Sequence, residues 1–154
     1  MALASDLDFQ WQYLATLDGR TCPVCGADDG KLYKQDQARP PVPRHINCRC
    51  TYLPHLGNLF GLPDEQRPAT KHDEHTVHHR DGSTSTKFTV SDVEHTTENY
   101  SEWITRQVEE DQTFAREVLG RTRFELLRDG KITLDKMVVD GRIKRLSELP
   151  MPFK

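Results

Sequence analysis

Four cysteines fall within a short stretch of the chain, in two closely spaced pairs: Cys22 with Cys25, and Cys48 with Cys50. Two thiolates separated by two residues can bind one ion from a single tight turn, and a second pair of ligands can complete a tetrahedron. Zinc favours sulfur-rich tetrahedral sites and undergoes no redox chemistry in them. The spacing therefore predicts a zinc site that holds two separate segments of the chain together.

The candidate ligands outnumber the four positions of such a site: Cys22, Cys25, His45, Cys48 and Cys50. His45 and Cys48 are three residues apart, which fits one turn of helix, whereas Cys48 and Cys50 are two apart, which fits one face of a strand. Nearby arginines (Arg20, Arg44 and Arg49) could offset the charge of either set. A slight preference goes to His45 with Cys48, and both choices stay open.

This surplus of mostly sulfur ligands is typical of a closed structural site. A catalytic zinc has three protein ligands, an open position and a nearby carboxylate base. The first residues also lack the basic and apolar stretches of a signal peptide. We therefore expect a reducing compartment, in which metal binding is favoured over disulfides, and no enzymatic activity.

The composition explains why the fold would need a metal. Hydrophobic residues are 35% of the chain, below the usual share of about 45–50%, so its core is small. Structural zinc contributes about 10–16 kcal/mol in model peptides, against a typical net stability of about 5–15 kcal/mol. A net charge of −3 argues against nucleic-acid binding over the whole surface. No apolar run reaches the length of about 20 residues that a membrane span needs.

Residues 1–60 are predicted to form a β-rich zinc-binding module. Apolar and polar residues alternate over 9–15, and residues 31–33 and 51–53 are two further strand candidates. Gly26 is expected to adopt a positive φ, so that backbone N–H groups point back at the cysteine sulfurs.

Residues 61–96 are predicted to form a polar, histidine-rich arm or hairpin. The segments before His79 and after Ser85 could pair across Asp81-Gly82, and residues 87–90 resemble a strand. The four histidines at 72, 75, 78 and 79 have metal-like spacing, but solvated histidines are commoner in such a segment.

Residues 97–154 are predicted to form a helical tail that packs on the module. Ser101 is the expected N-cap of a helix that buries Trp103, and Gly120 is expected to end or bend a second helix. Residues 133–138 are expected to form a third, short helix. The overall class is α+β: a small strand-rich, zinc-stapled module with a polar arm and a short-helix C-terminal tail.

Several of these segments together resemble a known family. The first block is LDGRTCPVC at 17–25, DGKLY at 29–33 and HINCRC at 45–50, and the second is YSEWITRQ at 100–107, VLGRTR at 118–123 and LRDGKI at 127–132. Both are similar to phage minor head (head-morphogenesis) proteins of the phage Mu protein F type. The resemblance covers about residues 8–60 and 97–149.

The resemblance implies a non-enzymatic structural protein of the virion, assembled in the host cytoplasm. Such a protein acts in capsid assembly, DNA packaging or delivery, with portal and capsid proteins as partners and packaged DNA as a further contact. Only the zinc ligands carry over residue by residue: Cys22, Cys25, His45, Cys48 and Cys50. The resemblance assigns no catalytic residue and no cofactor besides structural zinc.

Two alternatives belong to other classes. A metal-dependent HNH-like nuclease needs a histidine base beside a second bound ion, for which His72, His75, His78 and Asp81 are the candidates. The strand-and-helix pattern expected around such a site is missing from the sequence. A zinc-containing nucleic-acid adaptor is disfavoured by the acidic charge balance.

Overall fold

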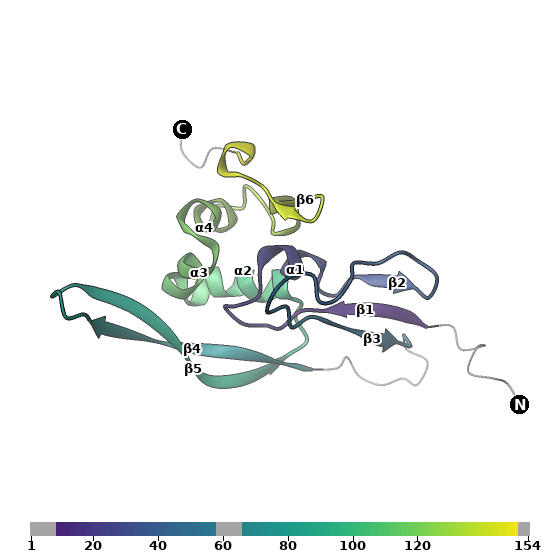
Figure 1. Ribbon diagram of the computed structural model, residues 1–154, viewed down its shortest axis with the longest axis horizontal. Coiled ribbons are helices and arrows are strands. Elements are labelled where there is room, and N and C mark those ends of the chain that lie inside the picture. The colour runs from purple at the N-terminus through teal and green to yellow at the C-terminus, as the bar shows by residue number, and fades with distance from the viewer. Residues whose placement is uncertain (1–8, 58–65, 151–154) are drawn as a thin grey trace, which may run out of the picture.

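The computed structural model describes residues 9–57 and 66–150. A small antiparallel sheet, a long β-hairpin and a group of short helices make up an α+β fold, as predicted (Figure 1). The predicted boundary between module and arm, at residue 60, lies outside the described residues.

The three strands predicted for the N-terminal module all form. β1 (Gln10–Leu14) is the central strand and pairs antiparallel with both β2 (Leu32–Lys34) and β3 (Thr51–His55). Tyr13 lies opposite Tyr52, and the two rings meet edge to face with centroids 5.3 Å apart. This aromatic face of the sheet is turned toward the cysteines, since Tyr13 and Cys25 are buried in the same cluster.

The predicted turn at the first cysteine pair is a six-residue helix, α1 (Pro23–Asp28). Cys22 is its N-cap residue and Pro23 opens its first turn, where the missing N–H of proline costs nothing. The expectation of a positive φ at Gly26 is wrong. Gly26 is required for a different reason: a Cβ there would lie 2.2 Å from Cδ1 of Tyr100.

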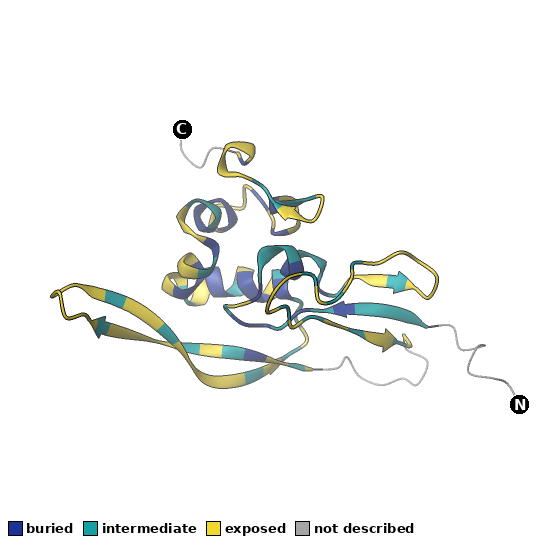
Figure 2. Cartoon of the chain, in the orientation of Figure 1, coloured by how far each residue is buried: buried dark blue, intermediate teal, exposed yellow. Residues whose placement is uncertain are grey.

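The polar segment forms the predicted hairpin, with its turn near Asp81-Gly82. Its strands, β4 (Arg67–His78) and β5 (Thr84–Thr96), are much longer than the short strand at 87–90 that the sequence indicated. Figure 1 shows this arm projecting from the body, and most of its surface is exposed in Figure 2. A register shift between Lys71 and His72 interrupts the pairing of the two strands.

Three helices follow the arm: α2 (Tyr100–Glu110), α3 (Gln112–Leu119) and α4 (Arg121–Arg128). Ser101 is not the N-cap of the first helix. Asn99 takes that position, accepting from the backbone N–H of Glu102 while the Glu102 side chain accepts from Asn99, a capping box. Gly120 ends α3 with a φ of 75°, as predicted.

The end of the described chain is less helical than expected. Residues 133–138 contain only a single 3-10 turn, η2 (Asp135–Met137). A minimal hairpin of β6 (Val138–Val139) and β7 (Arg142–Ile143) follows, turning at Asp140-Gly141, and a second 3-10 turn is η3 (Leu146–Glu148).

The apolar core is divided unequally between two clusters. The larger one lies among the helices, where buried residues gather in Figure 2. Trp103 and Phe124 of this cluster are fully buried. The smaller one contains only Tyr13, Ala15 and Cys25 as buried members. So little apolar burial leaves the N-terminal module dependent on other interactions.

The two clusters are joined through the buried carboxylate of Asp29. It accepts hydrogen bonds from the backbone N–H groups of Ala15, at 2.7 Å, and Tyr100, at 2.6 Å. It also forms an ion pair with Arg67 at the start of β4, at 2.9 Å. One side chain thus connects the sheet, the arm and the first long helix.

Candidate metal centre

The N-terminus of α1 sets the positions of the first two thiols. Cys22 lies at the N-cap and accepts, through Sγ, a hydrogen bond of 3.4 Å from the backbone N–H of Cys25. Cys25 lies one turn further along, and only 1% of it is exposed. Both are free thiols, as are Cys48 and Cys50.

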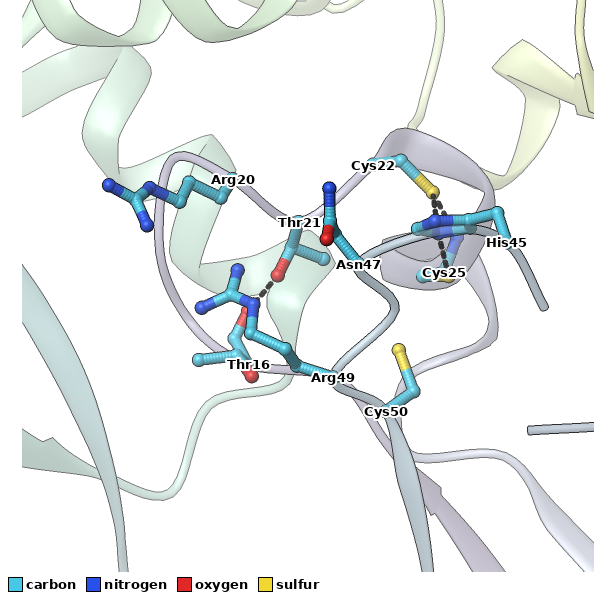
Figure 3. A pocket seen from close by; sticks show the side chains of 9 residues that line it. All are labelled: Thr16, Arg20, Thr21, Cys22, Cys25, His45, Asn47, Arg49 and Cys50. Atoms are coloured by element: carbon cyan, nitrogen blue, oxygen red, sulfur yellow. Dashed lines mark hydrogen bonds between the residues drawn. The ribbon is translucent and has the colours of Figure 1, made fainter. Parts of the chain in front are cut away.

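His45 faces both of these sulfurs. Its Nε2 atom lies 3.3 Å from Sγ of Cys22 and 3.3 Å from Sγ of Cys25 (Figure 3). In a tetrahedral zinc site, nitrogen and sulfur ligands are about 3.6 Å apart, as follows from the usual bond lengths. The Nδ1 atom lies 2.8 Å from the carbonyl oxygen of Ile46, to which it donates, so the lone pair of Nε2 is left for an ion.

The second cysteine pair approaches the same point from the other side. The sulfurs of Cys25, Cys48 and Cys50 all lie within 4.8 Å of one another, and so do the ligand atoms of Cys22, Cys25 and His45. Cys25 belongs to both groups. The structure therefore brings all five predicted candidates together around one buried thiol.

A small cavity lies within this group. Its volume is about 10 Å³, which is the size that a single small ion or water fills. Cys22, Cys25, His45 and Cys50 are among its lining residues, whereas Cys48 is not (Figure 3). Thiolates and imidazole are the donors that zinc prefers, so the residues present fit this metal.

The thiols differ in how readily they lose a proton. Burial raises the pKa of Cys25, and the neighbouring thiols of Cys22 and Cys50 raise it further. Burial acts in the same direction on Cys48, but hydrogen bonds from the backbone of Arg44 and of Cys50 lower its pKa to about 7. A bound cation would favour the thiolate at every one of these positions.

Two of the nearby arginines are engaged by aspartates. Arg44 forms an ion pair of 2.5 Å with Asp28 at the end of α1, and Arg49 forms a two-pronged pair with Asp18. These contacts fix the loop that carries His45 and Cys48 against the rest of the module. Arg44 also lies over the ring of Tyr13, 5.6 Å from its centroid.

The histidines and the aspartate proposed for a nuclease site do not come together. His72 is hydrogen-bonded to Thr70 within β4, and His75 is hydrogen-bonded to Thr89 across the hairpin. Asp81 accepts from Ser83 in the turn. Within residues 9–57 and 66–150, the two cysteine-containing groups are the only sets of three or more potential metal ligands.

Sequence reasoning did not identify the residues that support the centre. Asp18, Asp28 and Asp29 each lie near a glycine, where an aspartate is expected for turn formation alone. In the structure each of the three accepts from an arginine. Asp18 pairs with Arg49, Asp28 with Arg44 and Asp29 with Arg67. Only the alternating pattern around Tyr13 signalled a side chain that faces the cysteines.

Comparison with known protein families finds a match over residues 3–53, about a third of the chain. The matching family is described as Phage Mu protein F like protein, which confirms the resemblance seen in the first block of motifs. The second block lies outside the match and stays a prediction. Comparisons with curated proteins and with solved structures found no match. No helix in the described part of the chain is long and apolar enough to cross a membrane.

Proposed function

Because residues 3–53 match the model of the Phage Mu protein F like family, we propose that the chain is a non-enzymatic minor head protein of a phage. It acts in head morphogenesis, that is, in capsid assembly, DNA packaging or delivery, as a component of the virion. Its partners are portal and capsid proteins, and packaged DNA is a further contact. These contacts are shared among three parts of the chain: a zinc-stapled module (1–60), an arm (61–96) and a helical tail (97–154).

One observation supports the structural role of the metal: the five candidate ligands gather around Cys25, and four of these residues line one small cavity. A centre with more protein ligands than an ion needs leaves no position for water or substrate. Zinc bound there joins α1 to the loop before β3, which carries the second cysteine pair. The small apolar cluster of this module makes that link decisive for its folding.

The proposed ligands are Cys22, Cys25 and His45, and Cys48 and Cys50 compete for the fourth position. The variants Cys48→Ser and Cys50→Ser separate the two, by the zinc content of each purified protein. The cysteine whose replacement removes zinc is the fourth ligand, and the other cysteine lies near the ion without binding it. Zinc retained in full by both variants would contradict this ligand set.

The role in the head is tested in the phage that encodes the chain. We expect Cys25→Ser to reduce the yield of DNA-filled heads seen by electron microscopy, and we expect mass spectrometry to detect the wild-type chain in purified virions. Thr51→Ser is the matched control, a conservative change at an exposed residue next to Cys50. Normal heads with Cys25→Ser, or cleavage of plasmid DNA by the purified chain with magnesium or manganese, would contradict the proposal.

A further inference from the structure

A groove of about 730 Å³ lies between the outer part of the arm and helix α3. Five consecutive residues of β5, from Thr86 to Val90, line one side of it, whereas β4 contributes His72 alone. A run of consecutive residues presents both faces of a strand and its backbone edge. The groove therefore follows the outer edge of β5.

The two strands of the arm differ in how their edges are used. Near the body, β4 is paired at Ala69 with Leu17, and the N–H of Thr70 donates to the carbonyl oxygen of Leu17 at 3.0 Å. Beyond the register shift the ribbon twists, and β5 becomes the strand on the side of the helices (Figure 1). In the described part of the chain, no strand pairs with the outer edge of β5.

The groove has an apolar floor. The rings of Phe88 and Phe114 meet edge to face with centroids 5.5 Å apart, and His72 stacks on Phe114 at 4.0 Å. Val118 extends this floor along α3, and Val90 of β5 is 57% exposed beside it. A two-stranded ribbon is marginal in water by itself, and a third strand over this floor would bury these side chains.

The rim of the groove carries cations without partners. Neither Arg20 nor Lys87 makes a side-chain hydrogen bond or an ion pair within the described residues. Of the acidic residues at the groove, Asp18 is already bound by Arg49, which leaves Glu117. The balance of unpaired charge is positive and favours an acidic occupant.

We propose that the outer edge of β5 binds an extended, acidic segment of a partner protein as a third strand of the arm. Because side chains alternate across a strand, the residues of the bound segment that face Phe88 and Phe114 are apolar, and its residues opposite Lys87 are acidic. Backbone hydrogen bonds supply the affinity, and the alternating pattern supplies the specificity. This binding site is additional to the proposed function and does not depend on the metal centre.

The probe is a fluorescein-labelled peptide in which glutamate alternates with valine and phenylalanine. We expect its fluorescence anisotropy to rise saturably with the full-length protein. Lys87→Glu should weaken binding at least tenfold, and Arg80→Glu, the same charge change at the tip of the arm, should leave it unchanged. Thermal melting of both variants verifies their folding, since each side chain is exposed.

Two further measurements test the mode of binding. Amide hydrogen exchange should slow at alternate residues between Thr86 and Val90 when the peptide binds. N-methylation of alternate peptide residues, or lysine in place of glutamate, should abolish binding. The proposal would be overturned if the peptide slowed amide exchange only in β4, or if an altered peptide bound as tightly as the original probe. Absence of any binding would overturn it as well.

Other occupants give distinct results. Self-association that depends on protein concentration and is lost with Lys87→Glu would assign the edge to a second copy of the chain. Binding of a single-stranded oligonucleotide that is lost with the same variant would assign the groove to nucleic acid. Either result would overturn the proposal of an acidic partner strand.

Discussion

At the scale of single residues, the N-terminal module depends on one glycine, Gly26, and one buried carboxylate, that of Asp29. Gly26 allows α1 to approach the ring of Tyr100, and Asp29 is the acceptor through which the sheet, arm and helices are joined. Both lie within ten residues of the metal centre along the chain, yet neither is a candidate ligand.

Gly26→Ala should be strongly destabilising. The added methyl group would lie 2.2 Å from a ring that is itself fully buried, so α1 and α2 must move apart. Overpacking of this kind costs about 1–3 kcal/mol or more, which urea unfolding would measure. Gly82→Asn is the control, because that glycine has open space and asparagine tolerates its positive φ. Equal stability of Gly26→Ala and wild type would show that the two helices are not held at this distance.

Asp29→Asn should cost roughly 3–5 kcal/mol, the range for breaking a buried ion pair by removing one charge. Asparagine has one acceptor oxygen in place of two, so one of the N–H groups of Ala15 and Tyr100 also loses its partner. Chemical unfolding of this variant is compared with Asp36→Asn, at an exposed aspartate. A cost no larger than that of the control would mean that the carboxylate does not join the two clusters.

At the scale of elements, one arginine of α2 holds the base of the arm. Arg106 forms ion pairs with Glu98 at 2.8 Å, with Glu110 at 2.9 Å and with Glu94 of β5. The neighbouring Arg106 guanidinium keeps the pKa of Glu98 below its usual value of 4.5. This contribution to stability is present above about pH 4.5 and is lost as the pH falls through the lowered pKa.

Arg106→Gln should therefore reduce stability at pH 7 and reduce it less at pH 3, because protonation of Glu98 removes the charge with which Arg106 pairs. The measurement is urea unfolding of wild type and variant at the two pH values. Arg80→Gln, at the exposed tip of the arm, should show little effect at either pH. If the difference in unfolding free energy between wild type and Arg106→Gln were as large at pH 3 as at pH 7, these carboxylates would not be the source of the stabilisation by Arg106.

The elements also show what could be predicted from the sequence. Alternation around Tyr13 located a strand and the glycine at 120 located a helix end, because these signals are local. Helix α1 was missed because Gly26 suggests a turn, and its real role depends on Tyr100, far along the chain. The length of the arm was missed because its polar strands are paired by backbone hydrogen bonds, which leave no apolar pattern.

At the scale of the whole molecule, we propose that the candidate metal centre stabilises the N-terminal module separately from the larger core. The sequence identified all five candidate ligands, since their spacing is a local signal, and the structure brings them around Cys25. The choice among them was not predictable, because it depends on how the loop with His45 folds over α1. The ion pairs that fix this loop join residues as far apart as Asp18 and Arg49.

Our main proposal is that one zinc ion joins the two cysteine-bearing segments. Elemental analysis of the protein, purified under reducing conditions, tests it most directly, together with a Cys25→Ser variant and a melting curve for each. We expect one zinc per wild-type chain, and neither zinc nor cooperative melting of the N-terminal module in the variant, because Cys25 belongs to both ligand groups. A metal-free wild-type protein, or a Cys25→Ser variant that keeps its zinc, would contradict it.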